Sequence, residues 1–312
     1  MVDKITHCVL MVSYNQEEYI KIALDSIFDN KLLPDKVIIS DDCSTDNTWN
    51  IIMGFKEKYP NIIDAYRNEK NLGVNYNTNF VRQKGIDSNC DILSDCAGDD
   101  YLKPGLFEEL NKVVRENQIN VKKDKFIIIT NTEELHPDGS VTLVNNFKLK
   151  DTKDLLYYRL RGMLSYREIG MSRNLVKDMP DLRTDLGLHA DLLMTLDNEV
   201  SCEKIYFSSF ISCGYRMGVG CVSKEKYHML MESRLKVYEV AKNRYNFSDQ
   251  SLKYIDYDSS FLILCLNYNL KNWFNCFIKF IINPKFCNYG RISTLCPPAI
   301  KNFFKSFIKK NN

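Results

Sequence analysis

Short apolar runs alternate with amphipathic stretches along the N-terminal part of the chain. The apolar runs predict strands at residues 5–12, 37–40, 62–66 and 91–94. The stretches between them carry apolar residues at helical spacing and predict helices at residues 19–28, 45–59 and 76–84. Because the strands are apolar throughout and alternate with helices, we expect an α/β fold with a mostly parallel central sheet and helices on both faces. Ligands bind such sheets beyond the carboxyl ends of the strands.

The pattern becomes less regular after residue 106. The elements predicted there are a helix at 106–116, a strand at 126–130 in a hairpin with 141–144, a helix at 185–196 and an extended stretch at 204–208. Everything after about residue 224 is helix-forming and increasingly aromatic. We therefore expect an α/β domain over residues 1–225 and a helical, amphipathic extension over residues 226–312.

Polar residues follow each of the N-terminal strands. They are Ser13, Tyr14 and Asn15 after the first, Asp41, Asp42, Ser44 and Asp46 after the second, residues 68–73 after the third, and Gly98, Asp99 and Asp100 after the fourth. Since the carboxyl ends of parallel strands meet at one edge of the sheet, these residues predict a site for a cation and a polar ligand.

Each pair of adjacent carboxylates has two interpretations. Asp41 and Asp42 precede Ser44, a good helix N-cap residue, yet a carboxylate at a strand end also accepts hydrogen bonds from the imide N–H of uracil or from ribose hydroxyls. Asp99 and Asp100 are ordinary turn residues. They are also the kind of acidic pair with which proteins hold a divalent cation that carries phosphates.

Charge and cysteine content narrow the class of protein. The formal net charge is +2, but residues 271–312 hold eight basic residues and no acidic one, so the positive charge belongs to the tail. The chain has eleven cysteines, none in a C-x-x-C spacing, which favours reduced thiols over a disulfide framework or a structural zinc site. The apolar run at residues 8–12 is too short for a signal peptide, and we expect a cytoplasmic protein.

Four sequence motifs stand in order along the chain: VSYNQEEYI, SDDCSTDNT, NLGVNYNTNF and AGDDYLKPG. In this order and at these spacings they resemble the family 2 glycosyltransferases of the GT-A fold, and the resemblance runs from residue 9 to about residue 223. It implies transfer of a sugar, with inversion, from a nucleotide-sugar donor such as a UDP-sugar to a saccharide acceptor. The implied setting is the assembly of a bacterial surface polysaccharide, O-antigen or capsule.

The resemblance also implies roles for individual residues. Ser13 and Tyr14 match the base pocket, Asp41 matches the carboxylate that hydrogen-bonds uracil with Asp42 beside it, and Asn71 and Gly73 match a loop near the nucleotide. Asp99, with Asp100 beside it, matches the D-x-D motif that binds Mg²⁺ or Mn²⁺ across the diphosphate. Arg216 matches a phosphate contact or a structural arginine. Two positions depart from the family pattern. Ala97 stands where many relatives have the first Asp of D-x-D, and Thr78 stands where they have an Arg.

The resemblance also implies a catalytic base well after the metal motif, on or before a helix that faces the acceptor. Asp191, in LGLHADLLMTL, matches this place. Asp185 is a rival candidate, and His189 is a neighbour of both. An acid in the first turn of a helix also occurs for structural reasons, because the helix dipole favours it there.

The C-terminal tail has a pattern of its own. Apolar residues recur at helical spacing at Ile300, Phe303, Phe304, Phe307 and Ile308, and upstream at Trp273, Phe277, Phe280 and Ile281. With basic residues and no acids between them, these stretches suit the anionic cytoplasmic leaflet, although helices that cover the catalytic domain or a partner subunit give the same pattern. We expect a peripheral protein on the inner leaflet, an acceptor that is free or linked to polyprenyl diphosphate, and no nucleic-acid partner.

Other function classes fit less well. A dehydrogenase needs G-x-G-x-x-G after the first strand, and the chain lacks this motif. It also lacks the P-loop of P-loop NTPases. A sugar nucleotidyltransferase shares an α/β nucleotide fold, but the glycine-rich, basic N-terminal loop of such enzymes is missing. A non-catalytic sugar-binding or membrane scaffold on a degenerate GT-A fold stays open because of Ala97 and Thr78.

Overall fold

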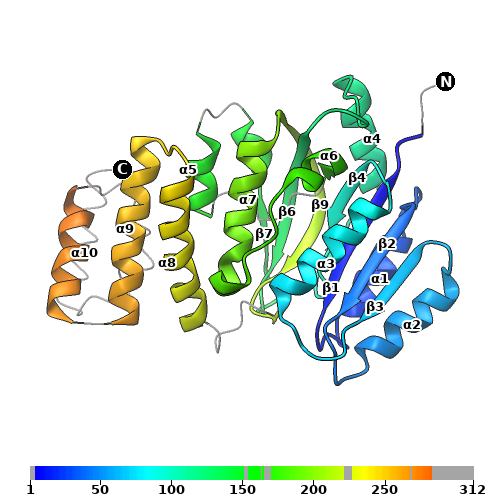
Figure 1. The fold of residues 1–312 in the computed structure, drawn as a ribbon, viewed down its shortest axis with the longest axis horizontal. Coiled ribbons are helices and arrows are strands. Elements are labelled where there is room, and N and C mark those ends of the chain that lie inside the picture. Colours follow the sequence, from blue (N-terminus) through cyan, green and yellow to red (C-terminus); the bar gives the residue numbers. More distant parts are fainter. Residues whose placement is uncertain are drawn as a thin grey trace. The chain divides into compact units, whose positions relative to one another are not determined.

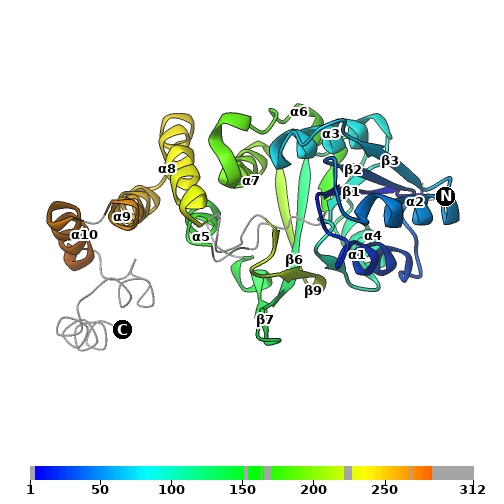
Figure 2. The same ribbon diagram turned by 90° about the horizontal axis from the view of Figure 1, so that it is seen from below.

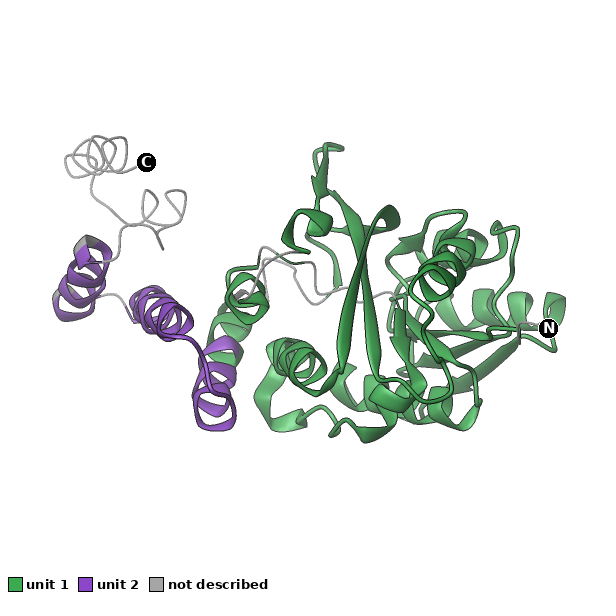
Figure 3. Ribbon diagram, turned by 90° about the horizontal axis from the view of Figure 1, so that it is seen from above, with its two compact units in different colours: residues 1–233 green, residues 234–312 purple. Residues whose placement is uncertain are grey.

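A computed structural model describes residues 4–150, 154–162, 164, 170–220, 227–267 and 269–282 of the protein. The chain divides into two compact units, Met1–Ser233 and Arg234–Asn312 (Figure 3). The predicted boundary between residues 225 and 226 lies outside the described residues. That the first region is catalytic and the second associates with the membrane stays a prediction.

The first unit is built on one sheet (Figure 1). Its strands are β1 (His7–Ser13), β2 (Lys36–Asp41), β3 (Ile63–Arg67), β4 (Ile92–Asp95), β5 (Tyr101–Leu102), β6 (Phe126–Leu135), β7 (Val141–Val144), β8 (Gly170–Ser172) and β9 (Lys204–Arg216). They are ordered β3-β2-β1-β4-β8-β6-β9-β5, and β7 pairs with β6 as the predicted hairpin. The strands β1 to β4 pair in parallel, as their apolar runs predict. The other half is mixed, because β8 is antiparallel to both β4 and β6 while β6 and β9 are parallel.

Helices cover both faces of the sheet (Figure 2). The helices of this unit are α1 (Ile20–Phe28), α2 (Thr48–Lys58), α3 (Val74–Asp87), α4 (Leu106–Glu116), α5 (Leu155–Leu160), α6 (Arg173–Asp178) and α7 (Ala190–Ser201), with 3₁₀ turns at Asn146–Leu149 and Thr184–His189. Alternate residues of β1 face opposite cores: Val9 packs in the cluster that contains Leu24 of α1, and Leu10 packs in the cluster that contains Val81 of α3. The α/β class with helices on both faces is therefore confirmed.

Two predicted elements differ from the structure. The extended stretch predicted at 204–208 is only the start of β9, which runs on to Arg216 because it pairs with the whole length of β6. The helix predicted at 185–196 is interrupted, because Gly187 lies at φ 77° and separates the 3₁₀ turn from α7. Only a glycine adopts this conformation without strain, so Gly187 marks a break that apolar spacing alone does not reveal.

The second unit is helical. It holds the end of α8 (Tyr227–Arg244), then α9 (Asp249–Leu266) and α10 (Leu270–Ile282). Arg234, Tyr238 and Asp258 form a buried polar cluster: the Asp258 carboxylate lies 3.0 Å from the Arg234 Nε and accepts from the Tyr238 hydroxyl at 2.7 Å. Burial raises the pKa of Tyr238 well above its ordinary value. Among the described helices, none combines the length and the apolar character needed to cross a bilayer.

Of the two amphipathic stripes predicted in the tail, the structure describes only the upstream one. The stripe at residues 300–308 lies outside the described residues. In the upstream stripe Phe280 is buried and Trp273 packs against a cluster with Phe261 and Leu264 of α9. Of the described residues of this stripe, Phe280 and Trp273 are therefore internal contacts of the second unit and not a free surface.

Candidate active site

The loops that follow β1 to β4 meet at one edge of the sheet. Ser13, Asp41 and Arg67, the last residues of β1, β2 and β3, are register neighbours. The amide of Asp42 donates to the carbonyl of Ser13 at 2.9 Å. The loop after β4 joins them at Gly98, where an added Cβ would lie 3.2 Å from the Cβ of Ser13. The convergence of loops that parallel pairing predicts is therefore present.

Side chains fasten the first of these loops to the second. The Asn15 amide donates to the Ser44 Oγ (2.9 Å), and the Asn15 Oδ1 accepts from the Thr45 amide (2.8 Å). The Gln16 amide donates to the Thr48 Oγ1 (2.8 Å). Asn15 lies at φ 51°, a left-handed conformation that asparagine tolerates better than most residues. The polar residues beside the two acids therefore hold the loops together, and residue types alone do not distinguish this role from ligand binding.

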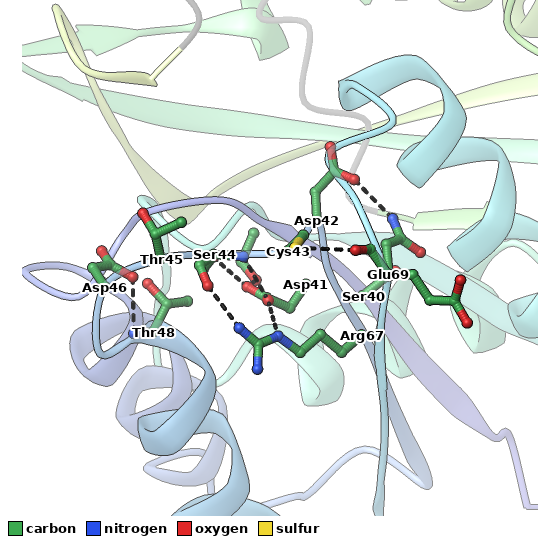
Figure 4. A network of polar contacts seen from close by, with 12 residues as sticks. Ser40, Asp41, Asp42, Cys43, Ser44, Thr45, Asp46, Thr48, Arg67 and Glu69 are labelled. Atoms are coloured by element: carbon green, nitrogen blue, oxygen red, sulfur yellow. Dashed lines mark hydrogen bonds and ion pairs between the residues drawn. The ribbon is translucent and has the colours of Figure 1, made fainter.

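Asp41 is wholly buried and its carboxylate is engaged by the protein (Figure 4). It accepts from the Ser44 amide at 3.0 Å and from the Ser44 hydroxyl, and it lies 3.4 Å from the Arg67 Nε. The buried Ser13 hydroxyl donates to it at 3.4 Å, whereas Tyr14 is 43% exposed. Through these contacts Asp41 anchors the loop after β2 to its neighbours. Its predicted contact with uracil stays a prediction.

Asp42 organises the third loop. Its carboxylate accepts from the backbone amides of Leu72 and Gly73, each at 2.8 Å, and from the Asn68 Nδ2 at 2.8 Å. The Asn71 Oδ1 accepts from the same Gly73 amide at 3.0 Å. Gly73 lies at φ 89°, directly before α3. Asp42, Asn71 and Gly73 thus share one task in this structure, which is to shape the entry into α3.

Asp99 differs from its neighbour Asp100. Asp100 is buried, and its Oδ1 accepts from the backbone amide of Arg216 at 3.1 Å. Asp99 is half-buried, and within the described residues no hydrogen bond or ion pair engages its carboxylate. Gly220, at φ 61°, comes so close that an added Cβ would lie 2.6 Å from the Asp99 Oδ2. The turn after β9 therefore approaches the free carboxylate in a way that only glycine allows.

Arg216 is held between two aromatic rings. Its guanidinium carbon lies 5.1 Å from the centre of the Tyr19 ring and 5.8 Å from that of Tyr101. Its Nε is buried and has no hydrogen-bond partner within the part of the chain that the structure describes. Burial raises the pKa of Tyr19, on which the charges of Arg216 and Asp99 also act. Tyr19 is a site neighbour that the sequence analysis missed, although it lies within the first motif.

Asp191 lies in the first turn of α7, as predicted. Its side chain is 47% exposed; the Oδ1 accepts from the Leu192 amide at 2.8 Å and lies 3.9 Å from the His189 Nδ1. The rival Asp185 forms a two-bond ion pair with Arg183, at 3.0 Å and 2.5 Å. Of these two acids, Asp191 is the one whose carboxylate is not held by a fixed positive charge among the described residues.

The strands β1 to β4 and the loops after them lie in the part of the chain that matches a known family. Residues 8–121 match the sequence profile described as glycosyl transferase family 2. They form a family 2 glycosyltransferase domain. The matched range includes Asp41, Asp42, Asp99 and Asp100, and Asp191 lies beyond it.

Curated relatives of the family 2 domain match part of the chain. Uncharacterized protein Rv1520 of Mycobacterium tuberculosis is 38% identical over 108 residues, which is 34% of this chain and 30% of that protein. The dTDP-rhamnosyl transferase RfbG of Shigella flexneri is 41% identical over 63 residues, 20% of this chain and 22% of that protein. The alignments thus span less than a third of the length of either relative.

Solved structures resemble nearly the whole chain. TarS 1–349 of S. aureus in complex with UDP-GlcNAc has a TM-score of 0.60 at 17% identity, over 98% of this chain and 89% of that chain. The mannosyltransferase PcManGT of Pyrobaculum calidifontis with GDP-Man and Mn²⁺ has a TM-score of 0.57 at 12% identity, over 99% and 84%. At these identities the likeness shows that the fold is GT-A.

The residues at the predicted D-x-D position form a turn, with Ala97 at the first position. The Asp100 amide donates to the Ala97 carbonyl at 3.0 Å, which closes a turn with Gly98 and Asp99 at its centre. No three potential metal ligands gather anywhere in the described ranges. A divalent cation at this turn would therefore depend on Asp99 and on oxygens from the nucleotide and from water, which is a usual arrangement for Mg²⁺.

Proposed function

We propose that the protein transfers a sugar, with inversion, from a UDP- or dTDP-activated donor to a saccharide hydroxyl. The observation that carries the proposal is the contrast among the acids at the sheet edge. Asp41, Asp42 and Asp100 accept hydrogen bonds from protein groups, whereas Asp99 accepts none within the described ranges. A carboxylate left open beside two ordered loops suits the binding of a cation with a diphosphate. TarS, solved with UDP-GlcNAc, and RfbG, a dTDP-rhamnosyl transferase, support a donor with a uracil-like imide.

The residues at the edge fit the Mg²⁺ or Mn²⁺ that the fold implies. Asp99 would supply the protein's ligand, and the neighbouring Asp100 would support the turn through its bond to the Arg216 amide. A bound divalent cation neutralises charge that develops on the departing nucleoside diphosphate. Arg216 provides a second positive charge, which is needed because Thr78 stands in place of a family arginine. The complex of PcManGT with Mn²⁺ supports this proposal.

Asp191 is the proposed general base. It stands at the start of α7 with a half-exposed carboxylate that is free of any arginine or lysine partner in the described structure. In this role it accepts the proton of the acceptor hydroxyl while the hydroxyl oxygen attacks the anomeric carbon. A single displacement of this kind inverts the configuration at that carbon.

The proposed function predicts metal-dependent nucleotide binding by the wild-type protein. We expect UDP or dTDP to bind in calorimetric titrations with Mn²⁺ and to bind at least about tenfold more weakly with a chelator, because the diphosphate then lacks its counter-charge. GDP serves as the matched control for base recognition. If folded protein binds none of the three nucleotides, the scaffold function replaces the proposed one; formation of a nucleotide sugar from UTP and a sugar phosphate would instead point to a nucleotidyltransferase.

For the acceptor and its location we propose a saccharide on a polyprenyl diphosphate, met at the cytoplasmic membrane surface, in O-antigen or capsule assembly. Helix α10 supports the membrane part. Phe274, Ile278 and Ile282 are 57%, 40% and 66% exposed and recur every fourth residue, so they share one face that does not pack on α9. No acidic residue occurs in α10 or after it. Apolar side chains beside basic ones are the features by which helices bind anionic lipid surfaces.

Vesicle sedimentation tests the membrane contact. The double variant Phe274→Ser/Ile278→Ser is expected to bind phosphatidylglycerol-containing vesicles at least about tenfold more weakly than wild type, because two apolar side chains no longer enter the lipid. Leu252→Ser, which changes an exposed leucine on α9, is the control and should bind as wild type does. Equal binding by the double variant, or no binding by wild type, would contradict the proposed lipid contact of this face.

A further inference from the structure

Helix α3 connects the nucleotide-facing loops to the segment that carries Asp191. At its N-terminus, the Asp42 carboxylate holds the amides of Leu72 and Gly73. On the face toward the sheet, the Asn77 Nδ2 donates to the Ser40 carbonyl at 2.9 Å. The N-terminal half of α3 is therefore fixed to β2 and to the loop that follows it.

A second face of α3 makes hydrogen bonds to the segment 182–187. The Asn79 side chain pairs with both backbone groups of Leu182: its Oδ1 accepts from the amide at 2.7 Å, and its Nδ2 donates to the carbonyl at 3.0 Å. One turn earlier, the Asn75 Nδ2 donates to the Gly187 carbonyl at 2.8 Å and lies 3.5 Å from the Arg183 carbonyl. Asn75 and Asn79 are four residues apart, so they project from the same side of the helix.

Leu182 precedes the 3₁₀ turn and belongs to no helix or strand, so regular secondary structure satisfies neither its amide nor its carbonyl. Leu182 and Leu186 are buried, and Gly187 breaks the chain direction at φ 77°. Buried backbone groups need partners, and an asparagine amide offers donor N–H groups and an acceptor oxygen side by side. From the other side, Ser233 donates to the Leu186 carbonyl and accepts from the His189 amide. The start of α7 is thus held on both sides, two residues before Asp191.

We propose that Asn75 and Asn79 are positioning residues that set the place of the Asp191 carboxylate relative to the donor loops. This inference rests on the proposed function, in which Asp191 is the base. A general base must lie within hydrogen-bond reach of the proton that it accepts, and small displacements lower the rate steeply. The Asn75 and Asn79 side chains bond the backbone of Leu182 and Gly187 and not the Asp191 carboxylate. We therefore expect them to affect the turnover number and to leave nucleotide affinity unchanged.

Hydrogen exchange of the nucleotide-free protein tests the hydrogen bonds between the Asn79 side chain and the Leu182 backbone. In Asn79→Ala the Leu182 amide is expected to exchange at least about tenfold faster than in wild type, while amides at residues 41–44 keep their rates. Gln83→Ala, an exposed change on the same helix, is the control and leaves both regions as in wild type. An unchanged Leu182 amide overturns the inference, whatever the activity.

A double-mutant cycle tests the link to Asp191. The rate of UDP release from UDP-GlcNAc, with water as acceptor, is measured for wild type, Asn79→Ala, Asp191→Asn and the double variant, beside calorimetric UDP affinity. We expect Asn79→Ala to lower kcat about tenfold or more with UDP affinity within twofold, and to add almost nothing to Asp191→Asn. Additive losses overturn the inference alone. A wild-type protein that neither binds nucleotide nor releases UDP overturns the proposed function, and the positioning role with it.

Discussion

Asp99→Asn is expected to remove metal-dependent nucleotide binding while the protein stays folded. The substitution keeps the size of the side chain and removes the charge that a divalent cation requires. Because Asp99 makes no hydrogen bond within the described residues, its loss leaves no buried partner unsatisfied and should not lower the thermal midpoint. In the presence of Mn²⁺, calorimetry should show UDP affinity reduced on the order of 100-fold.

Two matched variants define what this result means. Asp87→Asn, an exposed acid on α3, should bind UDP as wild type does. Asp100→Asn should behave in the opposite way to Asp99→Asn: weakening the acceptor of the Arg216 amide costs about 1–3 kcal/mol of folding free energy, visible in a thermal melt. If Asp99→Asn keeps wild-type affinity and its metal dependence, the cation is held elsewhere and the proposed metal ligand is wrong.

The sheet was predictable because its signal is local. The apolar runs that end at Ser13 and Asp41 are buried strands whatever surrounds them, and the polar residues after them must lie at the carboxyl edge once the strands pair in parallel. The full length of β9 was not predictable in this way. Its second half, up to Arg216, mixes polar and apolar residues without regular alternation and becomes a strand through pairing with β6.

The division of labour among the acids was not predictable from their positions. Asp42 and Asp99 both follow strands, yet one carboxylate is surrounded by the amides of Leu72 and Gly73 and the other is left open. Which case arises depends on where the backbone N–H groups of a distant loop point. The same limit applies to Asn79, whose partner Leu182 lies 103 residues away in sequence. A motif marks the edge, and only the folded loops distinguish supporting acids from free ones.

Asp191→Asn should separate catalysis from binding. The amide cannot accept the acceptor proton, so we expect kcat for UDP release to fall by about 10²–10⁴, which corresponds to roughly 3–5 kcal/mol of transition-state stabilisation. UDP affinity should stay within about twofold of wild type, because Asp191 lies on α7 and not on the loops after β1 to β4. Steady-state kinetics and calorimetry on the same protein give both numbers.

The rival acid decides between two explanations of such a loss. Asp185 is bound to Arg183 by two charged hydrogen bonds, and a carboxylate held in this way is a poor proton acceptor because the arginine stabilises its ionised form. Asp185→Asn should therefore lower kcat by no more than about threefold, through a modest loosening of the turn before α7. If instead Asp185→Asn loses activity and Asp191→Asn keeps it, the base is the acid before the Gly187 break, and α7 serves the site only as a support.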